Sequence, residues 1–295
     1  MATLRELKGR IGSVASSEKI TGAMKMISSA KMHKAEGALR RLKPYRSTIE
    51  TIIANLLTAD ATFTSPLAEP RDVNRLTVVV LGSDDGLCGA YNVNLAKYLG
   101  ERIAEQRERY GDNLHVTIVP VGKKMAKAIV WFCRNLKNVD VKVPEVNSKS
   151  DGSDVKAFVD SLQASFLAGE TDAVDLLYMK YVSAGRQVAT FDRLMPLSPD
   201  VFSHEGIKPS ARPYIFEPDA QSIFSSVIPM YVLAMTQEVF VENRASEQAA
   251  RVMAMQAAND NAKKLLDQLR LEYNKLRQQS ITSELLDIVG GQVRD

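Results

Sequence analysis

Residues 83–92, SDDGLCGAYN, are the stretch whose types and spacing come closest to a chemical site. They follow an apolar run and precede a helical pattern, an arrangement in which a helix N-terminus can bind a phosphate. The stretch matches neither G-x-G-x-x-G nor G-x-x-x-x-G-K-[ST], and Asp84 and Asp85 would repel a phosphate. We therefore expect a structural turn, with nucleotide binding as the alternative.

The cysteines and histidines form no recognisable nucleophilic or metal-binding pattern. Cys88 and Cys133 lie in apolar surroundings without metal-ligand spacing, and they indicate a reducing compartment and no disulfide framework. His33, His115 and His204 lie far apart in the chain. We therefore expect no enzyme active site, no metal and no cofactor.

Positive charge is concentrated in the first 46 residues, which hold eleven Lys and Arg against three Glu, although the 295-residue chain carries only +3. Such a segment favours an acidic partner, which could be a protein surface, nucleic acid or lipid head groups. The alternative is a solvated helix face. A nucleic-acid-binding coiled coil is a further functional class, but only 6% of the residues are aromatic and no recognition motif is present.

The longest predicted element lies at the C-terminus. Residues 230–289 contain no glycine or proline and are rich in strong helix formers. A single helix of this length measures about 90 Å at ~1.5 Å per residue, which is too long to pack only within its own domain. Its apolar positions alternate by four and three along one side: Ala262, Leu266, Leu269, Tyr273, Leu276 and Ser280.

A second long helix is predicted over residues 3–57. Its apolar residues recur at a spacing of three to four, and the stripe continues through Ile20, Met24 and Ile27 after a shift. Pro44 predicts a kink or a local boundary. Because both long helices have an apolar stripe, we expect them to pack on each other as an antiparallel coiled coil.

The middle of the chain alternates short apolar runs with helical patterns, which predicts a small α/β domain with a mostly parallel sheet. The fold class is therefore α/β: a long antiparallel coiled coil of the N- and C-terminal helices plus a central Rossmann-like α/β domain, docked at one end or flank of the rod. The predicted divisions are an N-terminal coiled-coil helix (1–57), a linker (58–74), the α/β domain (75–196), a linker or foot (197–219) and a C-terminal coiled-coil helix (220–295).

No run of eighteen apolar residues occurs, so we expect no membrane span. The first residues lack an apolar signal core and enter a helical pattern almost at once. We therefore expect no targeting peptide, and this favours a bacterial protein.

Residues 277–289 combine a polar belt with an apolar end. An apolar rod end should be buried against something, either a partner or the first helix. The belt consists of Arg277, Gln278, Thr282, Glu284 and Asp287, and the apolar end of Ile281, Leu285, Leu286, Ile288 and Val289.

Four motifs together resemble the gamma-subunit family of F-type ATP synthases. ITSELLDIVGG, preceded by N-x-x-RQ, is similar to the family's C-terminal signature, and KITGAMKMISSAKM is similar to its N-terminal helix. SDDGLCGAYN resembles its central turn, and VENRASEQAARVMAMQAANDNA resembles its second helix. The resemblance covers the whole chain in order. Asp85 stands where the family usually has a basic or amide residue.

The resemblance implies a non-catalytic rotor subunit that couples proton flow through the membrane c-ring to ATP synthesis. The shaft tip would sit within a hexamer of alpha and beta subunits, and the foot would rest on the c-ring beside the epsilon subunit. Delta, a and b subunits would belong to the same complex. The expected location is the cytoplasmic face of the bacterial inner membrane, with membrane association only through the complex and no nucleic acid partner.

The resemblance also implies roles for particular residues. The expected beta-subunit contacts are Met24, Lys25, Arg277, Gln278, Thr282, Glu284 and Asp287. The tip inside the hexamer would be Ile281, Leu285, Leu286, Ile288 and Val289. The foot near epsilon and the c-ring would be Pro44, Tyr45, Tyr214, Phe216 and Glu217, with Pro44 and Tyr45 at a height comparable to the others. The alternative function is a small α/β nucleotide-binding protein with helical interaction arms.

Overall fold

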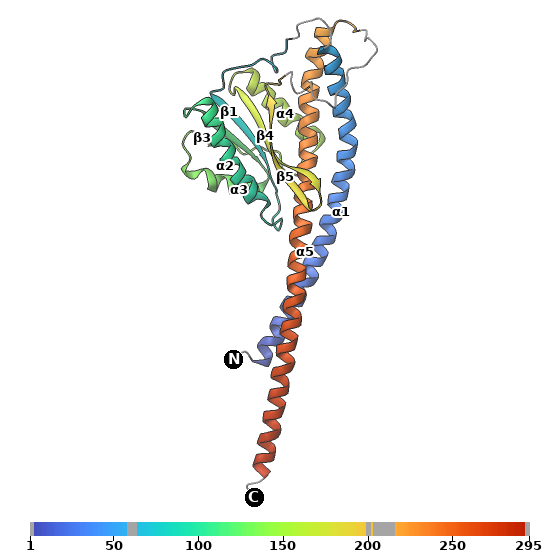
Figure 1. The fold of residues 1–295 in the computed structure, drawn as a ribbon, viewed down its shortest axis with the longest axis vertical. Coiled ribbons are helices and arrows are strands. Elements are labelled where there is room, and N and C mark those ends of the chain that lie inside the picture. Colours follow the sequence, from blue (N-terminus) through green and yellow to red (C-terminus); the bar gives the residue numbers. More distant parts are fainter. Residues whose placement is uncertain (1–2, 58–63, 199–201, 203–215, 293–295) are drawn as a thin grey trace.

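The computed structural model describes residues 3–57, 64–198, 202 and 216–292, and Figure 1 shows a rod of two long helices with an α/β domain on its flank. The elements in chain order are α1 (Leu4–Leu57), β1 (Arg75–Leu81), α2 (Tyr91–Tyr110), β2 (His115–Val121), α3 (Lys123–Phe132), the 3-10 turn η1 (Cys133–Asn135), β3 (Val139–Val141), α4 (Gly152–Leu167), β4 (Ala173–Ser183), β5 (Arg186–Met195) and α5 (Ala220–Gln292).

The rod is an antiparallel pair of α1 and α5, as predicted. Arg46 Nη1 of α1 lies 3.3 Å from Glu238 Oε2 of α5, and much further along the rod Asn259 Nδ2 donates to the Glu18 carbonyl at 2.7 Å. α5 has 73 residues, or about 110 Å, and α1 has 54 residues, or about 80 Å. The C-terminal end of α5 therefore extends beyond the start of α1 (Figure 1).

The N-terminus of α5 is capped by the side chain of Asp219. The Asp219 carboxylate accepts a hydrogen bond from the Ser222 backbone N–H at 2.9 Å and another from the Ser222 hydroxyl at 2.6 Å. A side-chain acceptor at this position satisfies one of the N–H groups that the first helical turn leaves without a partner. The long helix therefore begins at a defined residue, just after Pro218.

The predicted boundary at Pro44 is absent, because α1 continues through this residue to Leu57. A proline inside a helix costs about 3 kcal/mol, since it removes one backbone hydrogen bond and crowds the preceding turn. Leu39 and Ile49, on either side of Pro44, are both buried. Packing of these turns against α5 and the α/β domain offsets the local cost.

The apolar stripe predicted for the middle of α1 is partly wrong. Ile20 and Ile27 are 61% and 55% exposed, and the buried positions of the following turns are Ser28, Met32 and Ala35. Ser28 and Ala35 have small side chains, which let α1 and α5 approach closely without isoleucines at the seam. The stripe predicted for α5 is confirmed at Leu266 and Leu269, because both side chains are buried.

The sheet has the strand order β3-β2-β1-β4-β5, with only β5 antiparallel to its neighbour. Alternate residues of β1 face opposite layers: Val78 packs with α2 and α3, whereas Val79 packs with α4 and α5. β4 and β5 form an antiparallel hairpin. This mostly parallel sheet beside an antiparallel helix pair confirms the predicted fold class.

Helix α5 also contains a window of 18 residues with a mean hydropathy of 1.4, long and apolar enough by composition to cross a membrane. Within the protein, 56% of that window is buried. A helix at the centre of a protein core has the same composition, and α5 is such a helix where it runs between α1 and the sheet. Burial inside the chain therefore accounts for this hydropathy.

Candidate functional site

The place where this kind of sheet usually binds a ligand is filled by α5. In open α/β sheets, ligands bind at the carboxyl ends of the strands where the strand order reverses. That point lies here between β1 and β4. The buried Asn243 of α5 reaches it, and its Nδ2 donates to the Gly82 carbonyl at 3.0 Å, directly after β1. A nucleotide has no open crevice at this position.

The turn at residues 83–92 is structural. Asp84 Oδ1 accepts a hydrogen bond at 2.9 Å from the backbone N–H of Lys123, the first residue of α3, and Asp84 Oδ2 accepts from the Ser148 backbone at 3.0 Å. A carboxylate of this turn thus occupies the N-terminus of α3, a position that favours an anion. Asp85 pairs with Lys149 at 2.9 Å, and this hydrogen bond lowers the pKa of Asp85.

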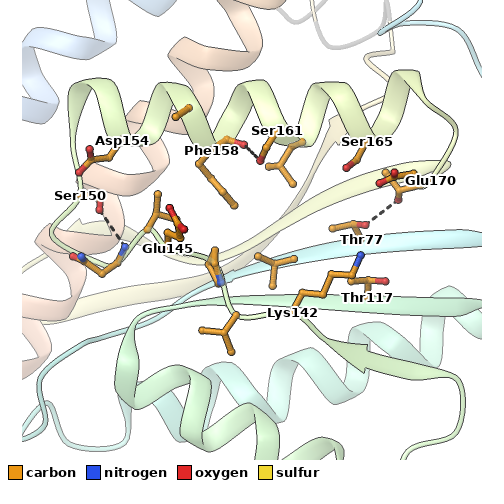
Figure 2. Close-up of a pocket in the computed structure, with 18 residues that line it drawn as sticks. Thr77, Thr117, Lys142, Glu145, Ser150, Asp154, Phe158, Ser161, Ser165 and Glu170 are labelled. Atoms are coloured by element: carbon orange, nitrogen blue, oxygen red, sulfur yellow. Dashed lines mark hydrogen bonds between the residues drawn. The ribbon is translucent and has the colours of Figure 1, made fainter.

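A cavity of about 660 Å³ lies between α4 and the edge of the sheet (Figure 2). Thr77 donates to the Thr171 hydroxyl at 2.9 Å, and Ser161 donates to the Phe158 carbonyl at 2.7 Å. These hydroxyls already have partners within the protein. Lys142 enters from the wall opposite α4, with its amino end near Thr77 and Thr117, and the carboxylates of Glu145, Asp154 and Glu170 also line the cavity.

The thiols and carboxylates of the α/β domain do not assemble into a reactive centre. Cys88 and Cys133 are buried, and burial raises the pKa of Cys133 to about 11. A thiol with so high a pKa is a poor nucleophile at neutral pH. Within the part of the chain that the structure describes, no three His, Cys, Asp or Glu side chains are placed to hold a metal ion.

The free end of α5 is the most distinctive surface of the protein. Its apolar side chains are exposed, although helices of soluble proteins usually bury such residues against the rest of the protein. Leu286 is 65% exposed and Ile288 is 61% exposed, and Ile281 and Leu285 are also exposed. Figure 1 shows no other element beside this part of α5. The backbone of the whole predicted tip lies in α5, but the side chain of Val289 lies outside the described residues.

The predicted polar belt lies on the same free end. Arg277, Gln278, Thr282 and Glu284 are all exposed, and the Thr282 hydroxyl donates to the Gln278 carbonyl of the preceding turn at 2.9 Å. Asp287 belongs to α5, but its side chain lies outside the described residues. Charged and apolar side chains are therefore both exposed on a section of helix that has no partner among the described residues.

The structure does not bring Met24 and Lys25 to that belt. A Cβ on Gly22 would lie 3.4 Å from Asn259 Nδ2, so this part of α1 is level with Asn259. Arg277 is about 27 Å further along α5 at ~1.5 Å per residue. Met24 and Lys25 are half-buried side chains on a separate, higher section of the rod. The predicted beta-subunit contacts thus occupy two levels.

Sequence reasoning missed exposed apolar residues at the upper of these two levels. Ile20, Met26 and Ile27 project from α1 beside the exposed Lys19. They lie on the strongly basic helix and combine apolar and positive character on one surface. Ile20 and Ile27 continue the apolar spacing of this helix, and for that reason they were assigned to the coiled-coil seam.

The predicted foot residues also fall at different heights, which corrects one expectation. Arg46 is level with Glu238, so Pro44 and Tyr45 lie about 30 Å along α5 from Glu217. In an antiparallel pair, the end of α1 at Leu57 lies nearest the start of α5. Because α1 continues beyond Pro44 to Leu57, Pro44 and Tyr45 lie level with residues well inside α5. Tyr45 and Glu217 are exposed, and Phe216 packs on the core. Tyr214 lies outside the described residues.

A long helical rod with a laterally docked domain and an uncovered apolar end defines a shaft protein, whose surfaces act on other chains. Comparison with known sequences agrees: the family model described as ATP synthase matches residues 3–293. The ATP synthase gamma chain of Bacteroides thetaiotaomicron is 37% identical over 303 residues and is covered completely, as is this chain. That of Polynucleobacter asymbioticus is 35% identical, with 99% of both chains covered. This chain belongs to the ATP synthase gamma-chain family.

Solved structures give the same architecture. A chain of the Euglena gracilis mitochondrial ATP synthase, from a structure described as OSCP/F1/c-ring in rotational state 3, has a TM-score of 0.68 at 20% identity. It covers 98% of this chain, and 93% of that chain is matched. A chain of the Tetrahymena thermophila enzyme, described as central stalk/c-ring, has a TM-score of 0.55 at 21% identity. At these identities the likeness concerns the fold.

Proposed function

We propose that this chain is the central rotor shaft of a proton-translocating ATP synthase. The shaft couples proton flow through a membrane c-ring to ATP synthesis in a hexamer of alpha and beta subunits, and it is not itself catalytic. The observation that carries the proposal is the free end of α5, an unpaired helix whose apolar side chains are exposed. In a gamma chain, such an end requires a partner that encloses it.

Torque transmission follows from the helix pair. A long α-helix is held along its length by backbone hydrogen bonds between successive turns, and a second helix packed along it resists bending. α1 and α5 supply this over most of the rod, and α5 alone continues into the tip. A rod of one or two helices is not cylindrically symmetric. At each rotational position it therefore presents a different surface to each of the three surrounding catalytic sites. Rotation then takes these sites through different states in turn.

The tip and the belt have separate roles in this proposal. Ile281, Leu285 and Leu286 supply an apolar bearing that contacts the hexamer without directional bonds, so it can turn without locking. Arg277, Gln278 and Glu284 supply polar contacts to beta subunits, as do Thr282 and Asp287. Met24 and Lys25 would contact the hexamer at the higher level, together with the exposed Ile20 and Ile27.

The opposite end of the rod is the proposed foot. Tyr214, Phe216 and Glu217 would lie near the epsilon subunit and the c-ring, with Pro44 and Tyr45 on the side of the shaft. Exposed Tyr45 and Glu217 can contact a partner directly. The proposed divisions of the chain remain the two coiled-coil helices, the central α/β domain of residues 75–196 and the connections at 58–74 and 197–219.

The chain belongs to the F1 portion of a membrane-bound complex, and we propose the cytoplasmic face of a bacterial inner membrane as its location. The bacterial sources of the most similar relatives support this. Delta, a and b subunits would be members of the same complex. Cell fractionation tests the location: the chain should sediment with inner membranes and leave them without detergent, and recovery only in the soluble fraction would contradict it.

Truncation of residues 281–295 tests the function. In purified complex, the truncated chain should lower ATP-driven proton pumping relative to ATP hydrolysis, because the tip no longer contacts the hexamer. A matched control is Leu271→Ser, which changes an equally exposed leucine of α5 above the tip. Unchanged coupling in the truncation would contradict the proposal.

Co-purification separates this function from its rivals. A tagged chain should bring down a hexameric ATPase and epsilon. Tight binding of ATP or NAD by the isolated chain would instead support the nucleotide-binding alternative. Salt-sensitive retention of DNA in a filter-binding titration would support a nucleic-acid-binding coiled coil.

A further inference from the structure

The part of α5 that crosses the α/β domain is polar and yet buried. Glu247 is 2% exposed and Arg251 4% exposed, and Glu242, Asn243 and Gln248 are also buried. These residues belong to the motif VENRASEQAAR, whose role in a rotating shaft is not explained by stiffness or by partner contacts. α1 covers one side of this stretch, and the α/β domain covers the other.

Arg251 connects α5 to the turn after β1. Its Nε donates to the Gly86 carbonyl at 3.1 Å, and its Nη2 donates to the Asp85 carbonyl at 3.2 Å. The same Nη2 lies 2.7 Å from Glu247 Oε1, one helical turn away. The planar guanidinium thus binds two successive backbone carbonyls while an internal carboxylate neutralises it, and this geometry fixes both distance and angle.

Asn243 makes a second connection two turns away. Its side-chain amide donates to the Gly82 carbonyl, and its Oδ1 accepts a hydrogen bond from the buried Tyr91 hydroxyl at 2.7 Å. Tyr91 is the first residue of α2, so Asn243 binds both the end of β1 and the start of the next helix. Asn243 therefore binds both ends of the turn, and Arg251 binds its middle.

Arg244 and Glu242 add connections to other parts of the domain. Arg244 donates from Nε to the Ser148 carbonyl at 3.2 Å and from Nη2 to the Ser150 carbonyl at 2.9 Å. Glu242 Oε1 accepts from the Tyr181 backbone N–H of β4 at 3.3 Å. Side chains within three turns of α5 therefore hold the domain at three separate places in its sequence.

Stability alone does not explain this choice of residues. Burying a charged pair carries a desolvation penalty that can exceed its Coulombic gain, and apolar residues of similar volume are often as stable or more stable. Apolar packing, however, tolerates small rotations of one body on another. Directional hydrogen bonds to backbone carbonyls do not tolerate such rotations, so they hold the two bodies in a single orientation.

We propose that Asn243, Glu247 and Arg251 are positioning residues that lock the α/β domain to the shaft in one orientation, so that the two turn as one rigid body. The lock itself follows from the contacts, and only its use in torque transmission rests on the proposed function. Without it, the domain would retain its apolar contacts with α5 but could swing about them. Rotation of the shaft would then be absorbed in part by that movement.

The test replaces the charged pair by apolar residues of similar volume, Glu247→Leu with Arg251→Met. The carbonyls of Asp85 and Gly86 belong to a partly exposed turn and can bind water instead. Spin labels at Lys127 on α3 and Lys264 on α5, both exposed, report the distance between domain and shaft. The full-length chain should give one narrow distance distribution, and the double variant a broader one with an unchanged or higher melting temperature.

A matched control makes the same chemical change on the exposed face of the rod, Glu272→Leu with Lys275→Met, and should leave the distribution narrow. An unchanged width in the junction variant overturns the proposal. A second variant, Arg251→Lys, keeps the charge next to Glu247 but cannot bind both carbonyls in one plane, so it too should broaden the distribution. A narrow distribution in this variant would also overturn the lock.

The functional consequence is measured in the assembled complex. The junction double variant should lower proton pumping relative to ATP hydrolysis, while assembly and hydrolysis persist. Full coupling together with a broadened distance distribution would overturn the role in torque. If the chain fails to assemble with a hexameric ATPase at all, the proposed function fails, while the distance measurement on the chain alone still decides whether the lock exists.

Discussion

Two halves of one helix, α5, have opposite relations between polarity and burial. The half beside the α/β domain buries Glu247 and Arg251, whereas the free half exposes Leu285, Leu286 and Ile288. Both halves are continuous helix with similar helix-forming composition. The difference lies in what surrounds each half, and it reverses the usual rule that apolar residues lie inside.

This reversal has a different meaning at each end. Buried polar groups that are fully bonded specify one arrangement of the parts that they join. Exposed apolar groups that are clustered indicate a surface awaiting a partner. The half with buried polar residues therefore fixes how the parts of this chain are arranged. The half with exposed apolar residues provides a surface for other chains. Four variants examine this contrast through the free energy of unfolding, from the largest expected effect to the smallest.

Glu247→Ala should have the largest effect. It leaves the buried guanidinium of Arg251 without its carboxylate, and breaking a buried pair in this way costs about 3–5 kcal/mol. The matched control is Glu284→Ala on the exposed free half, which should change the free energy by no more than about 0.5 kcal/mol. Chemical denaturation of the isolated chain measures the free energy of unfolding of both variants. Equal losses in the two variants would contradict the contrast between the two halves.

Leu269→Ala should rank second. Leu269 is 2% exposed at the seam between α5 and α1, and truncating a buried leucine costs about 2–5 kcal/mol through lost burial and the cavity left behind. Leu271→Ala, two positions away and 70% exposed, should cost about 0.5 kcal/mol or less. A large loss at Leu271 would mean that the exposed side of α5 is covered within the chain. Thermal unfolding of both variants measures the difference.

Asp85→Asn should have a small effect that depends on pH. The hydrogen bond from Lys149 lowers the pKa of Asp85 in the folded chain, so its stabilising contribution is present above the ordinary pKa of an aspartate and is lost as pH falls through the lowered value. For so exposed a pair, the loss at pH 7 should be about 1 kcal/mol or less. Wild type and variant should converge in acid, and a gap that widens as pH falls would contradict this sign.

Leu285→Ser with Leu286→Ser should change stability least, by about 0.5 kcal/mol or less, because both side chains are already exposed. The same change should nevertheless weaken coupling in the assembled complex. Stability is measured by denaturant titration and coupling by proton pumping per ATP hydrolysed. A marked loss of stability in the isolated chain would show that the tip is packed within the chain and is not free for a partner.

Sequence reasoning succeeded where periodicity and residue type act locally. The long run without glycine or proline and the stripe containing Leu266 and Leu269 were both predicted from neighbouring residues. It failed for the local boundary that was one of the two outcomes expected at Pro44, and for Ile20 and Ile27. In the first case, packing across the rod outweighed a local break signal. In the second, the apolar residues outnumbered the positions on one seam, and only the partner helix decides which of them face inward.

The sequence by itself determined that the chain contains two long helices around an α/β domain, because helix propensity and hydrophobic period are properties of short stretches. It also determined the family, through motifs distributed along the whole chain. Only the tertiary structure decided the relative heights of α1 and α5, and with them the separation of Met24 from Arg277 and of Pro44 from Glu217. Only the tertiary structure, likewise, revealed that the turn at residues 83–92 and the polar motif of α5 bind each other. Contacts between residues more than 150 positions apart depend on how whole elements pack, and local pattern carries no information about that.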